Sequence, residues 1–307
     1  MRATRFRGIL LASGGAVVFS FDGLLIRLQS LSPAGIMFWR SVFATIAYGA
    51  MAFVAARAIQ PGTDPLRKSW APLLLITPLA LLSNTTFVFS ITHTAVSQTL
   101  VIVASVPIVT GILGYFALHE RLPLRTWLAG ATCLIGVVAV VAGNAGSVDL
   151  QGDLWGVASL AISAVLLVAF RRYPNASRLL ALMVAALAAD LVFSKWARPF
   201  PDSRTAIAAA VDGMLLVPGG WLLTSLAPRY LPAAEVGLFM LIETVLAPLW
   251  VFIIVGEVPT YAVVLSGAVI LGAIAVHSWL DLRSPSGSCP SLGASNDRED
   301  IYPEQLG

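Results

Sequence analysis

Residues 106–127 read VPIVTGILGYFALHERLPLRTW, an apolar stretch with a proline near its start and a charged turn at its end. Residues 248–259 read PLWVFIIVGEVP, which repeats the order of proline, apolar stretch, acidic turn and second proline. Proline lacks the N–H that a helix needs, and lipid offers no substitute. Interrupted helices at corresponding places of two halves indicate the central site of a transport protein.

Four prolines lie near the middle of long apolar stretches and form two pairs. They are Pro78, Pro107, Pro218 and Pro248. Because each removes a backbone donor, we predict that a helix breaks at each of the four, and that protein or a cavity satisfies the freed backbone groups.

A weak internal repeat supports this pairing. A shift of 137 residues places His119-Glu120-Arg121-Leu122-Pro123 over Gly256-Glu257-Val258-Pro259-Thr260. We expect a first repeat at 1–146 and a second at 147–281, each with five helices. Because five is odd, the second copy enters the membrane from the opposite face, and the repeat is inverted.

The composition agrees with a membrane protein. Of 307 residues, 58% are hydrophobic and 11% are charged, whereas soluble domains carry about 25% charged residues. We therefore predict an all-α integral membrane fold with ten transmembrane helices in two inverted five-helix repeats, followed by a disordered cytoplasmic tail at 282–307. The expected spans are 8–26, 34–56, 70–91, 94–117, 123–142, 153–171, 178–197, 208–227, 232–255 and 259–280.

The basic residues predict the orientation. With a cytoplasmic N-terminus, fourteen of them lie in inside segments and four in outside segments, and Arg40 within the second span completes the 19. This asymmetry fits the positive-inside rule and predicts that both termini are cytoplasmic, in a bacterial inner membrane. The loop between the seventh and eighth spans does not fit this rule, because it is basic although it is expected outside. If the prediction has missed a span, we expect to find it at this loop.

Several classes of function find no support in the sequence. Cys133 and Cys289 offer no metal cluster, and the three histidines are scattered over different helix ends. There is no phosphate-binding glycine loop and no block of basic residues for nucleic acid. We expect no enzyme activity, no cofactor, no metal and no nucleic-acid partner.

Short motifs resemble the EamA family of the drug/metabolite transporter superfamily. They are Phe38-Trp39-Arg40 at the second span, Val106-Pro107 through Leu118-His119-Glu120-Arg121-Leu122 to Trp127, Gly130 and Gly136, and the second copy from Pro248 to Gly256-Glu257, Gly267 and Gly272. The resemblance implies a cavity between helices three, four, eight and nine and helices one, two, six and seven. It also implies substrates such as amino acids, other metabolites, vitamins or S-adenosylmethionine.

The expected function is a secondary transporter that moves a small metabolite, such as an amino acid, by alternating access through a central cavity. Export is implied by the resemblance alone. The alternative is an uptake or exchange carrier for a cofactor or vitamin such as S-adenosylmethionine or riboflavin, and a third option is a non-transporting scaffold or sensor. The expected partners are a small-molecule substrate, the lipid bilayer and, if transport is coupled, a proton. We expect a monomer, with a homodimer as the alternative.

Glu243 is the central ionisable candidate. It lies about eleven residues into the ninth span, which at about 1.5 Å per residue places its carboxylate near the bilayer midplane. A charge there is costly, so it should face a cavity or a partner. We predict that Glu243 binds substrate or couples transport to a proton; the alternative is a protonated carboxyl that bonds to a hydroxyl on a neighbouring helix.

Asp22 and Arg40 are expected at similar depth near the outer face. An ion pair is the least costly way to hold both charges there. A structural pair, an outer gate and a contact with a substrate carboxylate remain open for these two residues.

Polar and aromatic side chains inside other spans complete the predicted site. Substrate binding is predicted for Trp39, Asn84, Gln98, Thr99, Ser105, Trp221 and Trp250, besides Glu243. Hydrogen bonding between helices is the alternative for the polar residues, and packing is the alternative for the tryptophans. His93, Asp190 and Asp212 are expected to be solvated groups near the outer face.

Overall fold

The computed structural model describes residues 2–58, 70–118, 150–173, 176–227 and 233–256, with 128, 131–132, 135, 230, 258, 261, 264–265, 268–269, 272 and 276. Within these residues the regular structure is helical throughout. The elements are α1 (Arg2–Phe19), α2 (Asp22–Arg27), α3 (Pro33–Ala58), α4 (Trp70–His93), α5 (Val96–Val103), α6 (Val106–Leu118), α8 (Leu150–Arg172), α9 (Arg178–Phe193), η1 (Ser194–Trp196), α10 (Ser203–Val211), η2 (Asp212–Leu216), α11 (Val217–Leu226) and α12 (Ala233–Val255).

Seven of the helical stretches in the described part of the chain are long and apolar enough to cross a membrane. They are Phe6–Arg27, Pro33–Val54, Pro72–His93, Val96–Ala117, Leu150–Arg172, Arg178–Trp196 and Ser203–Leu226, and α12 contains the shorter apolar stretch Ile242–Val255. The seven stretches correspond to the first four predicted spans and to the sixth, seventh and eighth, and α12 corresponds to the ninth. The predicted spans at 123–142 and 259–280 and the tail at 282–307 lie outside the continuously described residues, so the ten-helix count and the inverted repeat stay predictions.

Three of the spans are irregular near the middle. The first changes from α1 to α2 around Ser20 and Phe21, and the fourth changes from α5 to α6 around Ala104 and Ser105. In the eighth span, the π-helical turn η2 separates α10 from α11. Such irregular turns leave backbone groups that other residues must satisfy, and π-helical turns occur often at functional sites.

The proline prediction is right for one member of each pair and wrong for the other. Pro107 lies in the first turn of α6 and Pro218 in the first turn of α11, directly after irregular segments. Pro78 and Pro248 instead lie inside the continuous helices α4 and α12. A proline removes only its own N–H, so a helix that is packed between neighbours can continue through it with a bend.

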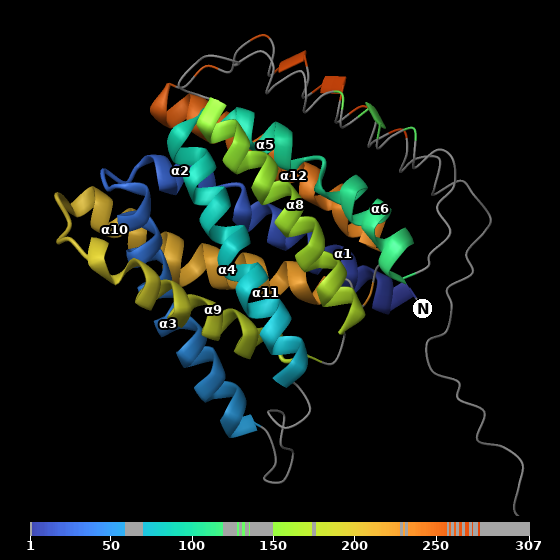
Figure 1. Ribbon diagram of the computed structural model, residues 1–307, viewed down its shortest axis with the longest axis horizontal. Helices are drawn as coiled ribbons and strands as arrows, with labels where there is room; N and C mark the ends of the chain where they lie inside the picture. Colours follow the sequence, from blue (N-terminus) through green and yellow to red (C-terminus); the bar gives the residue numbers. More distant parts are fainter. Residues whose placement is uncertain are drawn as a thin grey trace, which may run out of the picture.

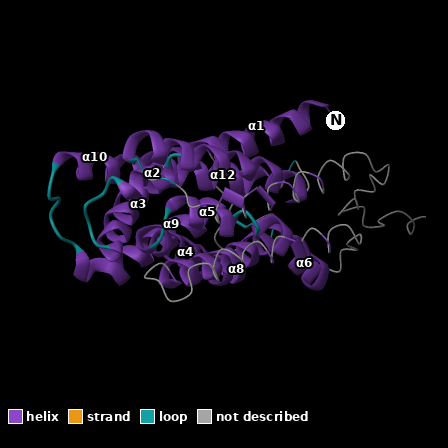
Figure 2. Cartoon of the chain, turned by 90° about the horizontal axis from the view of Figure 1, so that it is seen from above, coloured by secondary structure: helices purple, strands orange, loops and turns teal. Residues whose placement is uncertain are grey.

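The first half of the chain packs closely against the second half. The most extensive packing joins α4 to α8, α3 to α9, and α1 to α11 and α12. Figure 1 shows α4 between α8 and α9, with α3 beside α9. Seen from above, α1, α2 and α12 lie toward one face of the bundle and α4, α6 and α8 toward the other (Figure 2). The interior is therefore an interface between the two halves.

The loop between the seventh and eighth spans contains no additional span. Residues 197–202 join η1 to α10, and the Asp202 carboxylate accepts a hydrogen bond from the backbone N–H of Thr205 at 2.6 Å. A carboxylate in this position satisfies an otherwise unpaired amide at the start of a helix. The helix therefore begins at Ser203, five residues before the predicted start at 208.

Candidate functional site

A buried group of charges lies where α2, α3 and η2 meet. Nη1 and Nη2 of Arg40 donate to the two carboxylate oxygens of Asp22 at 2.5 and 2.9 Å. Nη1 also donates to Asp212 and lies 2.7 Å from both of its carboxylate oxygens. The side chains of Arg40, Asp22 and Asp212 are 2%, 3% and 0% exposed. With Gln29, whose Nε2 lies 3.4 Å from Oδ2 of Asp212, these residues form the charge cluster.

The irregular turns of the backbone place the two carboxylates. Asp22 begins α2 directly after the interruption of the first span, and Asp212 begins the π-helical turn of the eighth. Gly213 allows η2 to approach α3, since a Cβ atom at this position would lie 2.6 Å from the carbonyl oxygen of Arg40 and from Cβ of Phe43. The close approach of the two backbones brings Asp212 within reach of the guanidinium.

The charge cluster is held at an energetic cost. Removing three charged groups from water costs several kcal/mol each, about as much as their mutual attraction returns. Two polar atoms of the cluster, Nε of Arg40 and Oε1 of Gln29, have no hydrogen-bond partner among the described residues. A structure that only needed stability would pack apolar side chains here at lower cost, so the cluster is a strong candidate for function.

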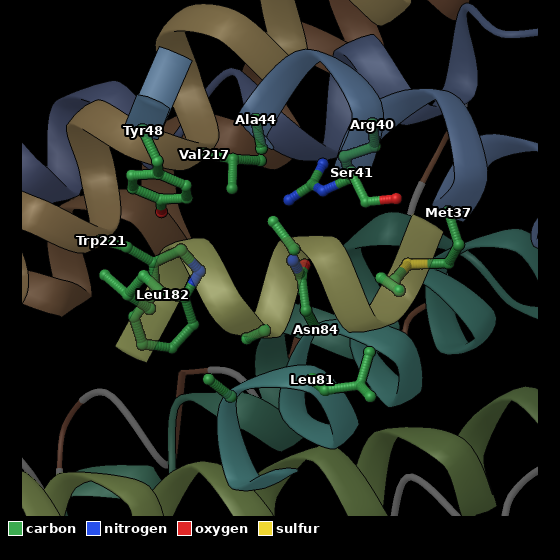
Figure 3. A pocket seen from close by; sticks show the side chains of 14 residues that line it. Met37, Arg40, Ser41, Ala44, Tyr48, Leu81, Asn84, Leu182, Val217 and Trp221 are labelled. Atoms are coloured by element: carbon green, nitrogen blue, oxygen red, sulfur yellow. The ribbon is translucent and has the colours of Figure 1, made fainter. Parts of the chain in front are cut away.

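A cavity adjoins the charge cluster. It is lined by Met37, Arg40, Ser41, Ala44, Tyr48, Ala80, Leu81, Asn84, Leu182, Ala185, Ala186, Ala189, Val217 and Trp221, from α3, α4, α9 and α11. Figure 3 shows the side chains of Arg40 and Tyr48 on α3, with Asn84 and Trp221 on other sides of the same space. About 30 Å³ is open to the centre of a water molecule, which holds about two waters.

The polar atoms at this cavity include several hydrogen-bond donors. Nε of Arg40 and the hydroxyl of Tyr48 are buried without a partner in the described part of the chain. The amide of Asn84 likewise makes no hydrogen bond to a described residue. Among the described residues that line the cavity, none is acidic, and three on α9 are alanines. The cavity therefore offers a cation, neutral donors and an apolar wall.

A second polar group lies between α4, α5 and α8. The hydroxyl of Ser90 lies 2.8 Å from that of Thr99 and donates to the carbonyl of Gly152 at 2.9 Å. Nε2 of Gln98 donates to Oδ1 of Asp153. We call these five residues the neutral cluster, because hydroxyl and amide groups bind its one carboxyl group and its backbone. The contacts cross three helices and join the two halves, and none of the five residues is among the described residues that line the cavity beside Arg40.

Comparisons with known proteins relate part of the chain to a family. Residues 6–142 match the model of the EamA-like transporter family. A protein of known crystal structure is also similar, with a TM-score of 0.69 and 18% sequence identity, over 91% of this chain and 100% of that one. At this identity the likeness shows a shared fold and nothing more. No curated protein matches the sequence.

The EamA-like match and the apolar helices together indicate an integral membrane transporter of the drug/metabolite type. A transporter of this type works on a small molecule within a lipid bilayer. The described residues contain no group of His, Cys, Asp and Glu that could hold a metal ion.

Two of the residues predicted to bind substrate, Asn84 and Trp221, line the cavity together with Arg40. The others lie elsewhere in this EamA-like bundle. Nε1 of Trp39 donates to the carbonyl of Arg198 at 2.8 Å, and Nε1 of Trp250 donates to Ser20 at 3.3 Å. Gln98 and Thr99 belong to the neutral cluster, and the buried hydroxyl of Ser105 has no partner among the described residues. Their substrate contacts stay predictions.

Glu243 lies on α12, which packs against α2 beside the charge cluster. Its side chain is partly buried, and its charge is close enough to interact with that of Asp22. Its alternative role, as a protonated carboxyl that bonds to a hydroxyl on a neighbouring helix, stays open. Binding or coupling by Glu243 stays a prediction.

The expected ion pair between Asp22 and Arg40 is present, but the interpretation of Asp212 was wrong. Asp212 is fully buried and pairs with Arg40 rather than facing solvent. Its place within an apolar stretch that also contains Pro218 was the signal that could have found it.

Asp190 is also partly buried and accepts a hydrogen bond from Thr45 at 2.9 Å. His93 bonds to the carbonyl of Phe89 at 2.7 Å.

Proposed function

We propose that this chain is a secondary transporter that moves a small metabolite, such as an amino acid, out of the cytoplasm by alternating access through the cavity beside Arg40. One observation carries the proposal: a buried ion pair between Arg40 and Asp212 joins the two halves of the chain at a cavity that has unpartnered donors. A scaffold or sensor gains nothing from such a costly arrangement at a cavity.

The small size of the cavity supports a mechanism in which the surrounding helices move apart. Binding pockets for small molecules measure about 300–1,000 Å³, whereas this cavity has about 30 Å³ of comparable space. A metabolite enters only if the helices around the cavity separate. Alternating access supplies this separation, on one side of the membrane at a time.

The first experiment identifies a substrate and then follows its movement. The purified protein is heated with amino acids, nucleosides, vitamins and S-adenosylmethionine, because a bound ligand raises the melting temperature by mass action. The compound with the largest shift is then tested for counterflow in proteoliposomes. A transporter exchanges labelled for unlabelled compound, and vesicles with protein that show no exchange above empty vesicles would rule out the proposal.

Glu243 supplies a test of coupling. If Glu243 carries a proton during transport, Glu243→Gln should abolish the dependence of transport on a pH gradient while leaving counterflow measurable. Counterflow and gradient-driven uptake are compared in the same vesicle preparation. A variant with normal gradient-driven transport would remove Glu243 from the mechanism.

A further inference from the structure

The two carboxylates of the charge cluster bind Arg40 in unequal ways. Asp22 engages both Nη1 and Nη2 in a forked arrangement, and it lies on the same half of the chain. Asp212 contacts Nη1 only, a nitrogen that already donates to Asp22. Forked pairs are the stronger and more directional of the two kinds. Asp212 is therefore the more exchangeable partner.

The surroundings give Asp212 few alternative partners. Gln29 offers a long contact of 3.4 Å. The other charged groups near it are Asp22 on α2 and Arg40 on α3, with Glu243 on α12 beyond Asp22. Two carboxylates on one guanidinium leave an excess negative charge. A carboxylate that leaves Arg40 in this setting is stable only if it takes up a proton.

The adjoining cavity suits the group that would replace Asp212. Arg40 lines the cavity, and its Nε has no partner among the described residues. The Tyr48 hydroxyl and the Asn84 amide supply further donors around the same space (Figure 3). With no acidic residue among the described residues of its lining, the cavity suits an anion such as a carboxylate, whose two oxygens match the fork of N–H donors on a guanidinium group.

We propose that Arg40 is the receptor for a carboxylate of the transported molecule, which replaces Asp212, and that Asp212 takes up one proton from solvent as it leaves. This inference rests on the proposed function. The incoming carboxylate adds one negative charge and the proton adds one positive charge, so the buried net charge stays constant. Because the contact between Arg40 and Asp212 joins α3 to η2, the same exchange releases one of the links between the two halves.

The test compares acids with their own amides. Butanoate, L-leucine and L-phenylalanine, and the three corresponding amides, are titrated into the purified full chain in nanodiscs, and Kd is measured between pH 5 and 8. In the wild type we expect tighter binding of the acids than of the amides. Because one proton accompanies each carboxylate, binding should tighten toward low pH by up to about tenfold per pH unit.

The decisive variant is Asp212→Asn. It replaces the competing carboxylate by a neutral side chain of the same shape, so the acids should bind about tenfold more tightly, and the pH dependence should disappear. Asp190→Asn is the matched control, because Asp190 also faces α3, through Thr45, but lies outside the charge cluster. It should leave both the affinity and the pH dependence unchanged.

Two results would overturn the inference: Asp212→Asn binds acids and amides as the wild type does, or none of the acids binds to either protein. If the variant does not fold, calorimetry of the wild type in buffers of different ionisation enthalpy decides, because zero proton uptake per bound acid contradicts the exchange. If acids bind but no counterflow occurs, the proposed function is wrong and the carboxylate site at Arg40 remains. If a compound undergoes counterflow but acids bind no more tightly than their amides, the proposed function remains and the carboxylate site is wrong.

Discussion

The charge cluster and the neutral cluster both join the first half of the chain to the second, but they do so with different chemistry. In the neutral cluster, Ser90, Thr99, Gln98 and Asp153 bind each other or the backbone of Gly152. In the charge cluster, Nε of Arg40 and Oε1 of Gln29 have no partner among the described residues, and the guanidinium borders a cavity. Of the two clusters, only the charge cluster contributes a described residue to the lining of the cavity.

At both clusters a glycine allows two helical segments to pack closely. A Cβ atom at Gly213 would lie 2.6 Å from the carbonyl oxygen of Arg40, and one at Gly152 would lie 2.6 Å from Cβ of Thr94. Close approach of helices is therefore common to both, as expected inside a membrane bundle. The difference lies in the guanidinium with its two carboxylates and in the cavity beside it, and these are the features that separate a candidate transport site from a structural contact.

The largest expected effect comes from Arg40→Met. It leaves two buried carboxylates without their cation, which should lower the free energy of unfolding by about 3–5 kcal/mol and abolish counterflow. Denaturant unfolding in detergent and counterflow in proteoliposomes measure the two effects. A variant as stable and active as the wild type would show that the charge cluster has no more importance than the neutral one.

The second-largest effect is expected when either of the two glycines is replaced by alanine. Gly213→Ala and Gly152→Ala each force a methyl group against a neighbouring backbone or side chain, which should cost about 1–3 kcal/mol in either variant. Only Gly213→Ala moves η2 away from Arg40, so only this variant should also change ligand affinity. Melting temperatures with and without bound ligand measure both quantities, and equal ligand affinities in the two variants would contradict the distinction.

The sequence predicted the membrane spans well because their signal is local. A stretch of apolar residues must match the thickness of the bilayer, so composition alone located the seven stretches of membrane-spanning length that the structure describes, and the shorter apolar stretch in α12. Helix irregularities were predicted less well. Pro107 and Pro218 mark irregular segments, whereas Pro78 lies in a continuous helix and the interruption near Ser20 contains no proline. Tertiary packing decides which prolines interrupt a helix.

The ion pairs of the candidate site were predicted only where the partners are near in the sequence. Asp22 and Arg40 lie on adjacent spans, and their similar depth was enough to predict the pair that the structure shows. Asp212 lies 172 residues from Arg40, and its contact depends on the π-helical turn and on Gly213, which no local pattern reveals. Asn84 and Gln98 looked alike in the sequence, yet the first lines the cavity and the second binds Asp153.

A smaller effect is expected from Gln98→Met in the neutral cluster. It removes the donor to Asp153, and the loss of one buried hydrogen bond should lower the free energy of unfolding by about 1–2 kcal/mol. The KM for counterflow should stay at the wild-type value, because Gln98 is not among the described residues that line the cavity. A large rise in KM would instead support the prediction that Gln98 binds substrate, and the neutral cluster would then be part of the transport pathway.

The smallest effect on stability is expected from Tyr48→Phe. The Tyr48 hydroxyl is buried and has no partner among the described residues, so its removal should change the free energy of unfolding by less than about 1 kcal/mol and can raise it. If the hydroxyl donates to the substrate in the cavity, the same variant should weaken ligand binding about tenfold. Asn84→Leu provides a second cavity variant, and a Tyr48→Phe protein with unchanged Kd would remove the hydroxyl from the binding site. Stability and affinity should thus separate at this residue, whereas both should fall together at Arg40, because the Arg40 side chain joins the two halves and, in our proposal, also binds the ligand.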